Sequence, residues 1–161
     1  MHILKHLPQQ FVGVILFLAM ALSANAPQAQ MVAMCEGSAL DPLLGEMSED
    51  AGRSFADGAI RVIDVYVDSN LPNAVLIAVL HPVPSELAGG GVFTGCSAVY
   101  STRDGPGFFG QVFLDRADAS YNPESGLTLD VPIRYYYSDR AAEEDQLTLI
   151  INQSTGYIDT R

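Results

Sequence analysis

Apolar and polar residues alternate most regularly over residues 127–137. Leucine, valine, isoleucine or tyrosine occupies every odd-numbered position, while Thr128, Asp130, Pro132 and Arg134 occupy even-numbered ones. Strand side chains point alternately to opposite faces, so this pattern predicts a β-strand with one buried and one solvated face. Because proline cannot donate a ladder hydrogen bond, Pro132 predicts that the strand lies at a sheet edge or carries a bulge there.

Other segments rich in Val, Ile, Tyr and Phe are bounded by turn residues and are predicted strands. Residues 74–80 are apolar throughout, which predicts a central strand covered on both faces. Six or seven strands at this spacing predict an antiparallel sheet or sandwich. Besides residues 127–137, the predicted strands are residues 59–68, 73–81, 92–101, 108–115 and 146–152, with a short one near Tyr157.

The segment that starts at Asp41 has the apolar spacing of an amphipathic helix. Asp41 can cap the first turn, Pro42 suits the first helical position, and Gly58 is the predicted end. The predicted fold is therefore a mainly β, antiparallel sandwich-like domain with one N-terminal α-helix; the alternative is an α+β fold in which this helix packs on one antiparallel sheet. The apolar face of the helix would contain Leu43, Leu44, Met47, Ala51 and Phe55.

The N-terminal residues have the pattern of a secretory signal peptide. A basic start is followed by residues 11–24, which are uncharged and almost entirely apolar. This run of about 14 residues is shorter than the roughly 20 that span a bilayer as a helix. We therefore assign residues 1–26 to a signal peptide, with cleavage between residues 24 and 29. Residues 27–161 form a single exported domain, periplasmic or extracellular, without stable membrane insertion after cleavage.

The charge of the exported part is strongly acidic. Lys5 is the only lysine and lies in the predicted signal peptide, so the formal net charge of −11 becomes −12 after cleavage. A surface of this sign repels nucleic acid and anionic lipid. It leaves cations and basic partners as compatible ligands.

Cys35 and Cys96 are the only cysteines, and export into an oxidising compartment predicts that they form a disulfide. The bond would close a loop of about 60 residues and stabilise the fold by roughly 4 kcal/mol. A reactive thiol or a metal ligand is the alternative, but the spacing is not C-x-x-C and partner histidines are lacking.

Candidate catalytic side chains are few. His81 is the only histidine beyond the predicted signal peptide, and it ends the most apolar predicted strand. We expect a residue in this place to be hydrogen-bonded to backbone. The sequence contains no G-x-S-x-G, H-E-x-x-H or P-loop motif. A triad that uses His81 with Ser85 or Ser97 stays open, as does a pair of acidic residues.

One acidic segment has the oxygen ligands that Ca²⁺ takes, namely carboxylates and amide carbonyls. It contains Asp115, Asp118, Asn122 and Glu124. A second acidic loop covers residues 139–145. Neither segment has the EF-hand spacing. Ca²⁺ is nevertheless the one cofactor that the sequence leaves open.

These features favour an exported, non-catalytic binding module whose unknown partner is a protein or a carbohydrate. Its candidate surface is the predicted edge near Pro132, with Arg134 and Tyr136. Two alternatives stay open: a small secreted hydrolase that uses acidic residues or His81, and a calcium-stabilised structural domain. Whether the protein is an enzyme is left undecided, with the shortage of catalytic side chains weighing against it.

Overall fold

The computed structural model describes residues 30–36, 52–67, 74–85, 90–102, 107–135 and 144–161. The predicted signal peptide lies outside these ranges. The described residues contain no helix with the length and apolar composition needed to span a membrane. The elements are β1 (Gln30–Met34), β2 (Arg53–Phe55), the 3₁₀ turn η1 (Ala56–Gly58), β3 (Ile60–Tyr66), β4 (Val75–Ser85), β5 (Gly91–Ser101), β6 (Phe109–Val112), the 3₁₀ turn η2 (Leu114–Arg116), β7 (Asp118–Asn122), β8 (Gly126–Tyr135), β9 (Glu144–Asn152) and β10 (Tyr157–Thr160).

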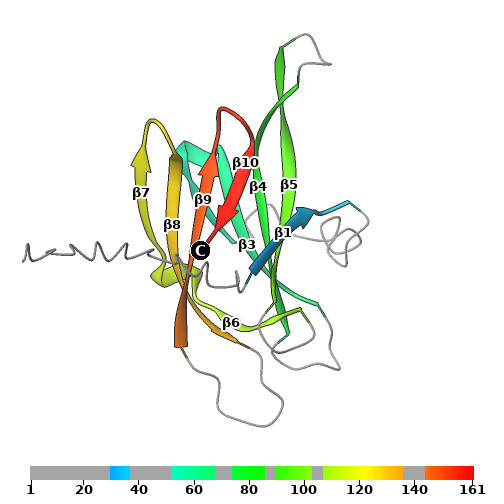
Figure 1. Ribbon diagram of the computed structural model, residues 1–161, viewed down its shortest axis with the longest axis vertical. Helices are drawn as coiled ribbons and strands as arrows, with labels where there is room; N and C mark the ends of the chain where they lie inside the picture. The colour runs from blue at the N-terminus through cyan, green and yellow to red at the C-terminus, as the bar shows by residue number, and fades with distance from the viewer. Residues whose placement is uncertain (1–29, 37–51, 68–73, 86–89, 103–106, 136–143) are drawn as a thin grey trace, which may run out of the picture.

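The strands form two antiparallel layers, as the sequence predicted (Figure 1). In the first layer the order is β1-β5-β4-β3-β2, and in the second β8 pairs with β9 on one side and with β6 and β7 on the other, while β10 pairs with β9. A single residue pair, Val75 with Phe109, joins β4 to β6 and connects the layers. The mainly β, sandwich-like prediction is therefore confirmed.

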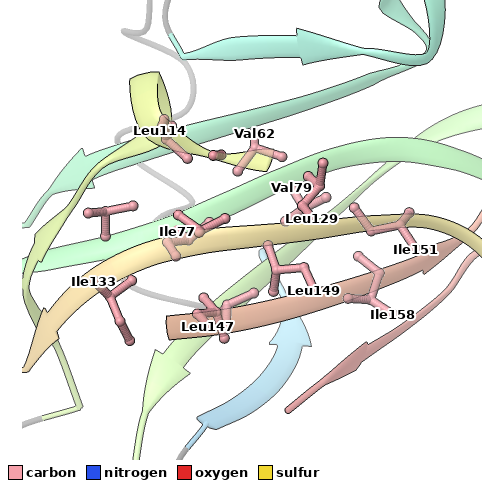
Figure 2. Close-up of a cluster of buried hydrophobic side chains, with 14 of the residues drawn as sticks. Val62, Ile77, Val79, Leu114, Leu129, Ile133, Leu147, Leu149, Ile151 and Ile158 are labelled. Carbon is pink, nitrogen blue, oxygen red and sulfur yellow. The ribbon is translucent and has the colours of Figure 1, made fainter. Parts of the chain in front are cut away.

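The main core lies between the layers, where alternate strand positions meet (Figure 2). On β8 the odd-numbered residues from 127 to 135 are buried and the even-numbered ones are half-buried, which confirms the predicted two-faced strand. Ile77 and Val79 of β4 face the apolar residues of β8 and β9 in this core. Close packing of side chains from both layers fixes the distance and angle between them.

Strand β4 is covered on both faces, as its continuous apolar run predicted. The inward side chains belong to the main core, while Leu76 and Ala78 join a second cluster on the outer face. Cys35 lies in this second cluster and forms the predicted disulfide with Cys96, with their Cα atoms 5.4 Å apart. The bond fastens the end of β1 to β5.

The predicted N-terminal helix is not observed in the described residues. Residues 41–51 lie outside them, and the remainder of the predicted helix, up to Gly58, forms β2 and η1. Gly52 and Gly58 have φ values of +81° and +87°, which are incompatible with an α-helix and delimit too short a segment for one. Phe55 is nevertheless buried, as the helical pattern predicted, because β2 places it against β3.

The sequence predicted that β8 lies at a sheet edge or carries a bulge at Pro132. The edge alternative is wrong, because β8 is paired on both sides, but its pairing with β6 and β7 is irregular at the proline. On one side of β8 the pairing is interrupted opposite Pro132, because β6 ends before η2 and β7 begins after it. The Pro132 carbonyl accepts a hydrogen bond from the Phe113 N–H over 3.0 Å. The N–H and C=O groups of a strand residue point to the same side, so the missing donor also faces the break. An interior strand therefore accommodates a proline without losing a regular ladder bond.

The Cys35–Cys96 disulfide is expected to contribute about 4 kcal/mol to the free energy of unfolding, because it closes a loop with a sequence separation of 61. Urea denaturation of the oxidised protein and of the Cys35→Ser/Cys96→Ser double variant measures this difference. Replacing both cysteines avoids a free thiol. Equal midpoints and slopes for the two proteins would contradict the expectation.

Candidate binding groove

A surface groove of about 470 Å³ lies between β1 and β10. These strands come from opposite ends of the described chain and appear side by side as the blue and red arrows of Figure 1. The groove is lined by Gln30–Met34 of β1, residues 156–160 of the β9–β10 turn and β10, and Ser97 of β5.

Each of the two strands offers backbone groups to the groove. Among the described strands, β1 pairs only with β5 and β10 only with β9. The Cys35 N–H donates to the Cys96 carbonyl over 3.1 Å, so the backbone groups of Cys35 face β5. Successive strand residues direct these groups to opposite sides. Met34 and Val32, one and three residues before Cys35, therefore direct theirs away from β5. Arg161 exchanges two hydrogen bonds of 2.9 Å with Thr148, so its backbone groups face β9. Ile158 is three residues earlier and therefore directs its backbone groups away from β9. Within the described ranges, both strands therefore present open edges to the groove.

The mouth of the groove carries exposed apolar side chains, while its inner end is closed by buried polar ones. Met34 is 75% exposed and Tyr157 is 66% exposed. Gln30 and Thr160 are buried. The Gln30 side-chain amide donates to the Tyr135 hydroxyl over 2.7 Å, and this bond joins β1 to the other layer. The groove thus has a fixed inner end and an apolar mouth.

His81 and Ser97 form a hydrogen-bonded pair beneath the groove. The His81 Nε2 atom lies 3.0 Å from the Ser97 Oγ atom, and Nδ1 lies 3.4 Å from the Pro82 carbonyl oxygen. A carbonyl can only accept, so the proton belongs on Nδ1 and the Ser97 hydroxyl donates to Nε2. Burial lowers the pKa of His81, and the Pro82 carbonyl opposes this effect to a smaller extent.

The geometry of this pair favours a structural role. His81 is only 2% exposed, and its hydrogen bonds in the described structure go to a hydroxyl and a backbone carbonyl rather than to a carboxylate. A Ser-His-Asp triad needs a carboxylate to orient the imidazole. The other serine considered from the sequence, Ser85, is four residues further along β4, roughly 13 Å away in a strand.

The structure does not bring the four predicted calcium ligands together. Asp115 lies in η2, Asp118 and Asn122 are the two ends of β7, and Glu124 lies in the following turn. The ends of β7 are roughly 13 Å apart along an extended strand. The Asn122 side chain accepts a hydrogen bond from the Glu124 N–H over 2.8 Å, which shapes the turn. The described residues contain no group of three or more His, Cys, Asp or Glu side chains placed to hold a metal ion.

Arg134, predicted as a binding residue, belongs to a surface network away from the groove. Its guanidinium lies 3.3 Å from a Glu144 carboxylate oxygen and donates to the Gln111 amide oxygen over 3.2 Å. Arg116 also contacts Glu144, over 3.4 Å, and lies 3.9 Å from the centroid of the Phe113 ring. Exposed pairs of this kind contribute about 0–1 kcal/mol each. Tyr136, the second predicted residue, lies outside the described ranges.

Comparison of the chain with protein-family models, curated proteins and solved structures finds no match.

The free energy of unfolding is expected to fall as the pH is lowered below about 6.5, because the unfolded chain then binds a proton at residue 81 that the buried imidazole resists. This stability is complete above pH 6.5 and is lost as the pH approaches the lowered pKa of the folded state. Urea denaturation at about pH 7.5 and about pH 5.5 measures the loss. The His81→Gln variant, which does not titrate, is expected to lose less stability over that interval; an equal loss in both proteins would refute the assignment.

Proposed function

We propose that the protein is an exported, non-catalytic binding module that takes an extended polypeptide segment into the groove between β1 and β10. Export is supported by the disulfide, which persists in oxidising compartments, and by the signal-peptide pattern of residues 1–26. We therefore expect the partner in the periplasm or the extracellular space.

The observation that carries the proposal is the pair of open strand edges facing one groove. A segment in extended conformation can use the backbone groups of Val32 and Met34 as a new neighbour of β1. Its alternate side chains would then meet the apolar mouth formed by Met34 and Tyr157. Backbone pairing supplies affinity in this mode, and the side-chain contacts supply selectivity.

Charge favours a segment that is neutral or basic. The exported chain has a formal net charge of −12 after loss of Lys5, and Asp159 lines the groove. Long-range attraction by such a surface raises the association rate of cationic partners and repels acidic ones. A polypeptide suits the open edges better than a carbohydrate, because only a polypeptide continues the hydrogen-bond ladder.

The two alternative functions have less support. A hydrolase that uses His81 would need the enclosed imidazole to meet a carboxylate, and the described contacts of that ring include none. A calcium-stabilised domain would need ligands that converge, whereas the four predicted residues are spread along β7 and its flanking turns.

Selection of ten-residue peptides from a displayed random library on the immobilised oxidised protein tests the proposal. Enriched peptides are expected to bind the Met34→Ser variant about tenfold more weakly, because an exposed apolar contact at the mouth is lost. Val32→Pro removes a groove-facing N–H without removing a β1–β5 ladder bond, and it should weaken binding to a similar extent.

The matched control is Tyr121→Ser, which removes a 64% exposed apolar side chain from β7. This variant is expected to bind the peptides as the unaltered protein does. The proposal fails if no peptide is enriched, or if the enriched peptides bind the two groove variants with unchanged affinity.

A further inference from the structure

Among the described residues of β5, Ser97 alone lines the groove between β1 and β10, and it is half-buried there. It lies directly opposite Met34 in the β1–β5 pairing. Cys35 and Cys96, the next pair along, are hydrogen-bonded to each other, so Met34 and Ser97 form a non-hydrogen-bonded pair, in which side chains come closest. The Ser97 hydroxyl therefore lies at the wall of the groove, beside the exposed Met34 side chain.

His81 holds the Ser97 hydroxyl from the buried side. On β4 it pairs with Gly95, two residues before Ser97, and such diagonal neighbours are within reach of aromatic side chains. The Nε2 atom lies 3.0 Å from the Ser97 Oγ atom, and Nδ1 lies 3.4 Å from the Pro82 carbonyl oxygen. Because that carbonyl only accepts, Nδ1 carries the proton and Nε2 accepts the hydroxyl hydrogen. Ser97 therefore offers the groove only the lone pairs of its oxygen.

In the described strands, no charged side chain faces His81. Strands β1, β4 and β5 contain no acidic or basic residue other than His81 itself. Arg61 of β3 adjoins a residue of the main core and points to the opposite face of its layer. Tyr157 and Asp159 flank Ile158 of the main core, so their side chains also point away from the core. Burial lowers the pKa of His81, and the imidazole is therefore neutral near pH 7.

The distance from the open edge of β1 to Ser97 selects long side chains. A segment that pairs with this edge lies two strand spacings from β5, or roughly 10 Å. Lys and Arg have long alkyl stems and carry hydrogen-bond donors but no acceptor. Their stems can pack along Met34 while the charged end meets Ser97. The exported chain, with a formal net charge of −12 after loss of Lys5, attracts such a cation.

Building on the polypeptide binding proposed above, we propose that Ser97 is a specificity-determining residue that selects a Lys or Arg side chain of the bound segment. His81 is the positioning residue that keeps the Ser97 hydroxyl as an acceptor. A proton taken from solvent at Nε2 reverses this arrangement, because the imidazolium must donate to Ser97 and the hydroxyl hydrogen then turns toward the groove. The groove would then present a donor and a buried positive charge to a ligand that is itself a cationic donor.

Peptides enriched from the displayed random library on the immobilised oxidised protein test the selectivity. They are expected to share a Lys or Arg at one position, and replacing it with norleucine, which keeps the stem and removes the donors, should raise Kd about tenfold. On the Ser97→Ala variant the same replacement should change Kd less than about twofold, because the acceptor is already absent. Measurement at roughly 0.15 M salt screens long-range attraction.

Two variants are the matched controls for this cycle. Ser97→Thr keeps the hydroxyl and is expected to respond to norleucine as serine does. Tyr121→Ser removes an exposed side chain from β7 and is likewise expected to keep the full response. The proposal is overturned if norleucine weakens binding equally on the unaltered protein and on Ser97→Ala.

The pH profile of peptide binding tests the role of His81. Kd is expected to be constant above about pH 6.5 and to rise as the pH falls through the lowered pKa, by at most about tenfold per pH unit. Fluorescence polarisation between about pH 7.5 and about pH 5.0 measures it, with far-UV circular dichroism as the check that the protein stays folded. His81→Gln does not titrate and is expected to bind more weakly at pH 7.5 and to lose the rise. A rise that is absent in the unaltered protein, or equal in His81→Gln, overturns the role of His81.

The imidazole tautomer can be measured without any peptide. Long-range ¹H–¹⁵N correlation NMR at about pH 7.5 is expected to show the proton of His81 on Nδ1, and a proton on Nε2 would overturn the proposed polarity of Ser97. Failure of the binding function itself looks different, because then no peptide is enriched. Peptides that depend on Met34 and Val32 but share no Lys or Arg would leave the binding function standing and overturn the selectivity alone.

Discussion

The burial of alternate strand side chains between two layers is the constraint on which the rest of the molecule depends. Leu129, Leu149 and Ile77 have no exposed surface in this core, and removing such side chains from water is the dominant favourable contribution to folding. Once their positions are fixed, the ends of the strands have little freedom. The core thereby places β1 beside β10 across a groove, although the two strands are not hydrogen-bonded to each other. It also carries β4 and β5 outward past their neighbours.

Strands that bury a regular face could be predicted from the sequence, because burial of one face requires apolar residues at every second position. Residues 127–135 alternate because one face meets the core, and residues 74–79 are uniformly apolar because both faces are covered. The disulfide could also be predicted, because only two cysteines are present and export favours their pairing. In each case the local pattern and the final environment agree.

The elements that were missed are those whose stability comes from backbone pairing or from distant partners. Every residue of β7 is exposed, so the segment Asp118–Asn122 has no apolar period to detect. The break opposite Pro132 depends on η2, which lies in a different part of the chain. The groove combines β1 with β10, and no local pattern indicates that residues so far apart will face each other. Arg134, which the sequence suggested as a binding residue, does not line this groove.

Burial of the core does not satisfy the backbone groups of the edge strands, because a layer that does not close exposes unpaired N–H and C=O groups. The strand edges of this chain differ in the backbone N–H donors that they carry. Pro82 and Pro84 remove two backbone donors from the outer part of β4. The strand pairing beside β8 is interrupted opposite Pro132, which has no N–H to donate. Among the described strands, the edges at Val32 and Ile158 carry no proline. An unprotected edge can accept a polypeptide in extended conformation as a further strand. The proposed binding of an extended segment therefore depends on the edges that carry no proline.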